Sequence, residues 1–229
     1  MTSDERKNIL QKFFSYNIDL YFNKLVLDNK FNIHKQEIET DLASIINIPL
    51  TDFLEYIFNN ISREAIAAAD VFQFSDFIDA TTNICSLLYN REPLGISFIE
   101  MGRLLLNDNI QRKDGALTKY GENHLKTAML LGLTFKHEKL YYLSAIGYVF
   151  QMYSEAQQEQ LLHRLIIRNK LVRQIILKAS NGSFELESYL YDLSRTTYIR
   201  RRTNIKHVLN VLKSSSDYDF TNIFNNITY

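Results

Sequence analysis

The stretch LTKYGENHLKTAMLLGLTFKHEKLYYLSAIGYVF, from Leu117 to Phe150, decides the fold class because its hydrophobic period changes along its length. The first part has apolar residues at helical spacing, between a candidate N-cap at Thr118 and a stop at Gly132. The part LTFKHEKLYYL alternates around a charged turn, which predicts a β-hairpin. Ser144 then stands where it can cap another helix. The stretch therefore predicts helix, hairpin and helix, in that order.

The residues before this stretch supply two more helices. One extends from about Asp76 to Asn90 and ends before the breaking sequence EPLG. The other, SFIEMGRLLL, begins with Ser97 and Glu100 at the spacing of a capping box. Helix, helix, hairpin, helix is the order of a winged-helix domain, and the helix from Leu117 with its hairpin resembles the recognition helix and wing of such domains. We therefore expect a winged-helix module at residues 76–153.

A basic helix is predicted further along, in LSRTTYIRRRTNIKHVLNVL from Leu193 to Leu212. At about 100° per residue, Tyr198, Ile205, Leu209 and Leu212 gather on one side. The other side carries hydrogen-bonding side chains that can contact base edges: Thr196, Arg200, Thr203, Asn204 and His207. Such a helix suits a DNA major groove, although the same pattern is typical of an ordinary helix with one solvated side.

The residues around this helix repeat part of the first plan. A long helical stretch from about Glu155 to Ser180 is predicted to break near Asn169, and the turn at 181–183 leads to the helical pattern SFELESYLYDL. We expect a shortened helix-turn-helix or winged-helix-like module at 154–213. Residues 214–229 are predicted to be a polar C-terminal tail with a short apolar anchor at Ile223, Phe224 and Ile227.

Two such modules in tandem resemble the paired winged-helix modules with which restriction-modification proteins recognise DNA. The resemblance rests on Leu193 and Ser194, on the segment from Thr197 to Thr203 with Arg201 and Arg202, and on the apolar residues that follow. Tandem winged-helix replication initiators share the plan less closely. The resemblance implies sequence-dependent binding of double-stranded DNA by a recognition or accessory component that works with a nuclease or methyltransferase.

The zero net charge of this 229-residue chain conceals an asymmetry. Residues 1–90 hold 7 Lys and Arg against 13 Asp and Glu, whereas residues 91–229 hold 19 against 13. We expect residues 1–75 to form an acidic helical region that dimerises or docks a protein partner. A helix-turn-helix pattern within it would present Asp52 and Glu55, which would repel phosphate.

The sequence lacks the patterns of membrane proteins and of disulfide-bonded proteins. No stretch approaches the roughly 18 apolar residues of a membrane span, so we expect a cytoplasmic protein without a membrane partner. The one cysteine, Cys85, lies in an apolar run and is interpreted as a core residue. His124 falls on the inward side of its helix, as a hydrogen-bonded core residue.

Catalytic motifs are also missing from the sequence. It has no phosphate-binding glycine loop, zincin helix, nucleophile elbow or dinucleotide fingerprint. The five histidines are scattered, and acidic pairs such as Glu185 and Glu187 have no strand core to hold them. We expect no enzyme activity, cofactor or metal. A protein-docking module and a nuclease with an unrecognised site remain as alternative hypotheses.

The predicted DNA contacts divide by chemistry. Arg200 is the candidate for a two-bond contact with guanine, while Asn123 would contact adenine and Glu122 would accept from cytosine. Arg201 and Arg202 are expected to touch phosphate or to pair with the acidic residues Glu185, Glu187 and Asp192. Phosphate contacts are also expected from the lysines of the first module. The full predicted set is Lys119, Glu122, Asn123, Lys126, Lys136, Lys139, Thr196, Thr197, Arg200, Arg201, Thr203, Asn204 and His207.

Overall fold

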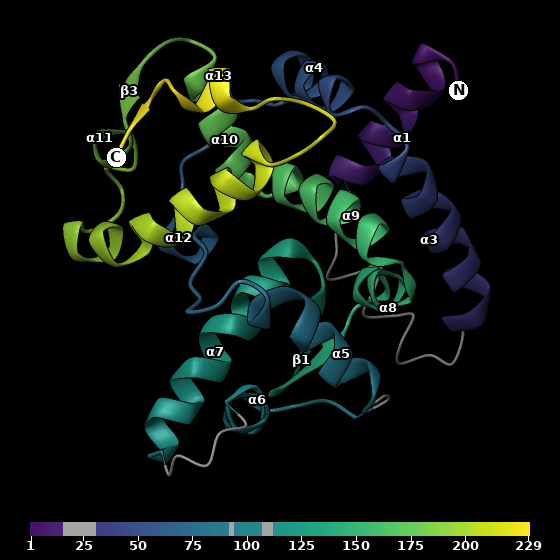
Figure 1. The fold of residues 1–229 in the computed structure, drawn as a ribbon, viewed down its shortest axis with the longest axis vertical. Coiled ribbons are helices and arrows are strands. Elements are labelled where there is room, and N and C mark those ends of the chain that lie inside the picture. The colour runs from purple at the N-terminus through teal and green to yellow at the C-terminus, as the bar shows by residue number, and fades with distance from the viewer. Residues whose placement is uncertain (16–30, 92–93, 107–111) are drawn as a thin grey trace. The chain divides into compact units, whose positions relative to one another are not determined.

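The computed structural model describes residues 1–15, 31–91, 94–106 and 112–229, and these residues are mainly helical (Figure 1). The predicted mainly α class with a small β-hairpin is confirmed. The chain divides into two compact units. Unit 1 combines residues 1–15, 44–72 and 159–229, and unit 2 combines residues 16–43 and 73–158. Within the described residues, no helix has both the length and the apolar character needed to cross a membrane.

Unit 2 contains the elements expected between residues 76 and 153. A π-helical turn, Asp79–Asn83, continues into the first of its short helices. The elements that follow the turn are α5 (Ile84–Tyr89), α6 (Phe98–Leu105), α7 (Asp114–Leu131), β1 (Thr134–His137), β2 (Leu140–Leu143) and α8 (Ala145–Met152). The strands β1 and β2 pair antiparallel, from Thr134 opposite Leu143 to His137 opposite Leu140. The predicted order of helix, helix, hairpin and helix is thus observed, preceded by most of α3 (Phe31–Ile46).

The capping residues of unit 2 explain where its helices begin and end. Ser97 and Glu100 form the predicted capping box, with Ser97 N–H donating to the Glu100 carboxylate at 3.0 Å. Ser144 caps α8 by accepting from Gly147 N–H at 2.9 Å, and Gly132 ends α7 with a φ of 82°. The N-cap predicted at Thr118 is wrong. The helix begins at Asp114, whose carboxylate in the first turn is favoured by the helix dipole.

Helices α6 and α7 meet backbone to backbone through two glycines. A Cβ on Gly102 would lie 2.0 Å from the carbonyl oxygen of Leu117, and a Cβ on Gly121 would lie 2.0 Å from that of Phe98. No side chain can occupy these positions without forcing the helices apart. The glycines therefore set how closely α7 packs on α6.

His124 joins α7 to the segment before the π-helical turn. Its ring is buried, with Nδ1 2.7 Å from the carbonyl oxygen of Tyr120. Its Nε2 accepts from the N–H groups of Ser75 and Asp76, each at 3.3 Å. This pattern requires the neutral ring with its proton on Nδ1, and burial lowers the pKa of His124. The expected inward, hydrogen-bonded position of His124 is confirmed.

Unit 1 joins both ends of the chain. Its elements are α1 (Ser3–Ser15), α4 (Leu50–Asn60), a 3₁₀ turn (Ala68–Asp70), most of α9 (Glu155–Arg168), α10 (Lys170–Ala179), β3 (Phe184–Glu185), α11 (Leu186–Tyr189), α12 (Arg195–Lys213), α13 (Thr221–Phe224) and β4 (Ile227–Thr228). Asn169 separates α9 from α10 and caps α10 by accepting from Leu171 N–H at 3.0 Å, which confirms the predicted break. Of residues 1–75, which were expected to form a separate acidic region, residues 1–15 and 44–72 belong to unit 1 and residues 31–43 and 73–75 to unit 2.

The last residues of the chain are folded into unit 1. Phe220 and Phe224 are buried, and β4 pairs parallel with β3, with Phe184 opposite Ile227. Of the expected apolar anchor, Phe224 and Ile227 are buried and Ile223 is half-buried. A segment expected as a polar tail therefore ends in a strand.

Arg164 links three parts of unit 1. Its side chain is 2% exposed, and its Nη2 donates to Asp217 Oδ2 at 2.6 Å and to the Ile48 carbonyl oxygen at 3.0 Å. Nη1 donates to the Gln160 carbonyl oxygen at 3.2 Å. The guanidinium thus connects α9 to the segment before α4 and to the loop after α12.

The glycine crossing predicts opposite effects for two alanine substitutions in α7. Gly121→Ala should destabilise unit 2 by about 3 kcal/mol, because the new methyl group meets the Phe98 carbonyl. Gly115→Ala is the matched control, since a Cβ there has nothing within 4 Å, and it should be neutral or stabilise by about 0.5 kcal/mol. Urea unfolding followed by circular dichroism measures both. Equal effects of the two variants would contradict the close crossing.

The buried imidazole predicts a loss of stability toward acid pH. Because the folded pKa of His124 is lowered, the unfolded chain binds more protons below its ordinary pKa of about 6.5. This contribution to stability is complete above that pH and is lost as pH falls through the folded pKa. His124→Gln should therefore flatten the decline in melting temperature between about pH 7 and pH 5. Some decline should persist, because burial also lowers the pKa of His163. An unchanged decline in the variant would contradict the neutral ring.

Candidate nucleic-acid interface

Helix α12 is held by a cap at its start and by an apolar side along its length. Ser194 Oγ accepts from Thr197 N–H at 3.3 Å, as the predicted helix start requires. The predicted apolar side is confirmed, because its members are all buried: Tyr198, Ile205, Leu209 and Leu212. Val208 is buried as well, so the inward side is wider than four residues suggested.

Asn204 does not lie where the sequence placed it. It was expected on the outward side with Arg200, but it is only 9% exposed. The reason is its position one helical turn before the buried Val208, at the edge of the widened inward side. Asn204 is thereby removed from the residues that can contact a base.

One edge of the outward side carries a row of cations. The row, called the cation row below, consists of Arg195, Arg202, Lys206 and Lys213, spaced by seven, four and seven residues. At about 100° per residue these side chains fall within an arc of roughly 40°. At about 1.5 Å per residue the row extends roughly 27 Å along the helix. Only Arg202 was singled out from sequence, although the spacing of seven could have revealed the others.

The cation row is only lightly engaged within the molecule. Arg195 lies 3.6 Å from the carboxylate of Glu187, with the Arg195 side chain 83% exposed. Lys206 Nζ lies 5.0 Å from the centre of the Tyr229 ring. Among the described residues, no carboxylate comes within 4 Å of Arg202, Lys206 or Lys213. Exposed ion pairs contribute little, so the row is available to an outside anion.

The other edge of the outward side carries Arg200 and His207. Both are exposed, as are Thr196 and Thr203, which were predicted on the same side. Arg200 Nε donates to the Thr196 carbonyl oxygen at 3.3 Å, and the described residues place no carboxylate within ion-pairing distance of Arg200. Thr197 is half-buried beside the Ser194 cap. Of the predicted residues on α12, four are therefore exposed on one side of the helix, whereas Thr197, Arg201 and Asn204 are half-buried or buried.

Arg201 has different partners from those expected. It was predicted to touch phosphate or to pair with Glu185, Glu187 or Asp192. Its Nη1 instead donates to the carbonyl oxygens of Ala68 and Val71, at 3.1 Å for Val71. The carbonyls at the end of the 3₁₀ turn lie beside the inward edge of α12, so Arg201 attaches the helix to the rest of unit 1.

Most other cations of the C-terminal half also act inside unit 1. Lys170 pairs with Asp70 at 3.3 Å, and Arg173 pairs with Glu64 at 3.5 Å. Arg168 lies over the ring of Phe13 at 5.3 Å, and Lys178 lies 5.9 Å from the ring of Phe184. The cations of residues 159–229 are therefore divided between internal contacts and the outward side of α12, while eight of the 19 cations counted from residue 91 onward belong to unit 2.

The candidate residues of unit 2 are largely neutralised on α7. Glu122 accepts from Lys119 at 2.8 Å and from Lys126 at 2.6 Å, and hydrogen bonds from the two lysines lower the pKa of Glu122. Asn123 is half-buried on the same helix. Lys136 and Lys139 are exposed on the β1–β2 hairpin. The cytosine contact predicted for Glu122 would require it to leave its two lysines.

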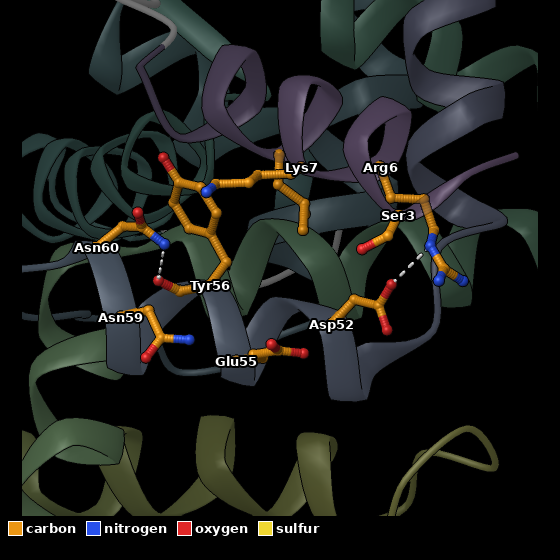
Figure 2. Close-up of a pocket in the computed structure, with 9 residues that line it drawn as sticks. Ser3, Arg6, Lys7, Asp52, Glu55, Tyr56, Asn59 and Asn60 are labelled. Carbon is orange, nitrogen blue, oxygen red and sulfur yellow. Dashed lines mark hydrogen bonds and ion pairs between the residues drawn. The ribbon is translucent and has the colours of Figure 1, made fainter.

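A separate polar pocket of about 140 Å³ lies between α1 and α4 in unit 1 (Figure 2). Side chains of both signs line it, and Arg6 Nε is 3.0 Å from Asp52 Oδ2. Asn60 Nδ2 donates to the Tyr56 carbonyl oxygen at 3.0 Å. Of the two carboxylates expected to face outward, Glu55 is exposed at the rim, whereas Asp52 is half-buried in its ion pair with Arg6. The pocket thus joins paired charges and amides, without a cation excess.

The described residues were predicted to hold neither a metal site nor a reactive cysteine. In the described part of the chain, no cluster of three or more His, Cys, Asp or Glu side chains is arranged to hold a metal ion. Cys85 is fully buried, and burial raises the pKa of its thiol, which fits a core residue.

Comparisons of the chain with protein-family models, with curated proteins and with solved structures found no match.

Proposed function

We propose that this protein binds double-stranded DNA through the outward side of α12 and has no catalytic site of its own. The observation that carries the proposal is the charge distribution on α12, with the cation row along one edge of the outward side and the exposed Arg200 on the other edge, beside His207. Duplex DNA presents two phosphate strands that border its major groove. A helix with a row of cations on one edge and Arg200 on the other matches that charge distribution.

Unit 2 is proposed to contain a winged-helix module with α7 as its second nucleic-acid contact. Support comes from the order of its elements and from Ile96, which exchanges two backbone hydrogen bonds with Tyr141 of β2 at 2.8 and 2.9 Å. Such a bridge supplies a third, minimal strand beside the hairpin. Service in a restriction-modification or related DNA-processing system remains a prediction of the resemblance.

A protein-docking role for α7 is the second candidate function. The Lys119, Glu122 and Lys126 group is the observation in its favour, because paired lysines attract phosphate less strongly than the open row on α12. In this case α12 would contact DNA while unit 2 contacts another protein.

The proposal predicts a salt-dependent affinity that α12 controls. Binding of the full chain to a mixed-sequence duplex should weaken with salt, with a log-log slope of about −0.9 per phosphate contacted. Arg202→Gln and Lys206→Gln should each reduce that slope by about 0.9. Lys170→Gln is the matched control, because Lys170 pairs with Asp70 and should leave the slope unchanged. A salt-independent affinity would contradict DNA binding.

A base contact by Arg200 makes a different prediction. Arg200→Ala should weaken binding to a preferred duplex by about 1 to 3 kcal/mol and relax the preference at one base pair. Selection from a randomised duplex pool, followed by fluorescence anisotropy, measures both effects. An equal loss on every sequence would assign Arg200 to a phosphate instead.

A further inference from the structure

Ile199 is an apolar side chain on the polar side of α12. It is 52% exposed, and it lies between the cation row and the edge formed by Arg200 and His207. Thr196 precedes it by three residues and Thr203 follows it by four, so the three side chains adjoin on the helix surface. Each carries a methyl group. We call these three residues the methyl ridge.

The methyl ridge contributes little to the stability of the fold. Isoleucine and threonine are β-branched and lose rotamer freedom in a helix, so neither is favoured there for its propensity. Thr196 and Thr203 are exposed, and half of Ile199 remains in solvent. The ridge therefore exposes apolar atoms to solvent at positions where a charged or amide side chain is usual.

We infer that the methyl ridge contacts the 5-methyl groups of thymine in the major groove, with Ile199 as the main contact. The inference rests on the proposed DNA binding and adds the class of sequence that α12 prefers. The major groove displays the thymine methyl group between the two phosphate strands, and apolar side chains are its usual partners. On α12 the ridge likewise lies between the cation row and Arg200.

This geometry also selects DNA over RNA. An A-form RNA duplex has a deep, narrow major groove that a helix cannot enter, and its uracil lacks the methyl group. The substrate class is therefore thymine-containing B-form duplex DNA.

The test replaces single methyl groups in the DNA. A duplex selected by the full chain from a randomised pool is remade with deoxyuridine in place of each thymine in turn, and affinity is measured by fluorescence anisotropy. At one or two positions the wild-type chain should lose about fourfold in affinity, the value expected for one buried methyl group.

Two variants assign that loss to Ile199. Ile199→Ser should bind the thymine and deoxyuridine duplexes equally, while Ile199→Val should keep the discrimination. Serine and isoleucine have similar helix propensities, so α12 should persist, as circular dichroism would verify. Ile78→Ser is the matched control, because Ile78 is 61% exposed on unit 2 and should leave the discrimination unchanged.

The outcomes separate the inference from the proposed function. Binding of duplex DNA with no loss at any deoxyuridine, or with the same loss in Ile199→Ser, overturns the methyl contact and leaves DNA binding in place. Failure of the chain to bind any duplex overturns both. A loss confined to chains with an aliphatic residue at position 199 supports the inference.

Discussion

A buried guanidinium is stable only when hydrogen-bond acceptors surround it, because removing the charge from water costs several kcal/mol. Arg164 has such acceptors at its terminal nitrogens, of which the Ile48 carbonyl and the Asp217 carboxylate come from 116 and 53 residues away, while its buried Nε has no hydrogen-bond partner among the described residues. The segment before α4 and the loop after α12 must therefore pack around α9. Desolvation lowers the pKa of Arg164 while Asp217 opposes that shift. The segment before α4 and the loop after α12 are thus both attached to α9 by this one charge.

The need of buried cations for internal partners also explains which cations face outward. Lys170 and Arg173 lie beside carboxylates contributed by residues 64–70, and Arg201 lies beside the carbonyls of the 3₁₀ turn. In the cation row only Arg195 has a carboxylate within 4 Å among the described residues, and that ion pair with Glu187 is exposed. Lys170, Arg173 and Arg201 thus have partners inside unit 1. The cations on the outward side of α12 are left to form an interface. In unit 2, Glu122 satisfies two lysines locally and leaves α7 with a balanced surface.

Local features of the fold were predictable because neighbours in sequence produce them. The capping box at Ser97, the caps at Ser144 and Ser194, the break at Asn169 and the end of α7 at Gly132 each depend on a few adjacent residues. The hairpin followed from alternation around a charged turn. The N-cap of α7 is Lys113, five residues before the predicted Thr118, and its side chain makes no capping hydrogen bond that the sequence could have signalled.

The sequence by itself determined the helices, the hairpin and the apolar side of α12, because each follows from the spacing of apolar residues that are close together in the chain. Only the tertiary structure decided that Asn204 turns inward, that Arg201 holds the 3₁₀ turn and that the last sixteen residues close unit 1 with a strand. These outcomes depend on partners more than forty residues away in the sequence, or on the width of the buried side of α12, and a helical wheel shows neither. The basic helix therefore keeps its place as the candidate interface, with a different set of residues on its outward side.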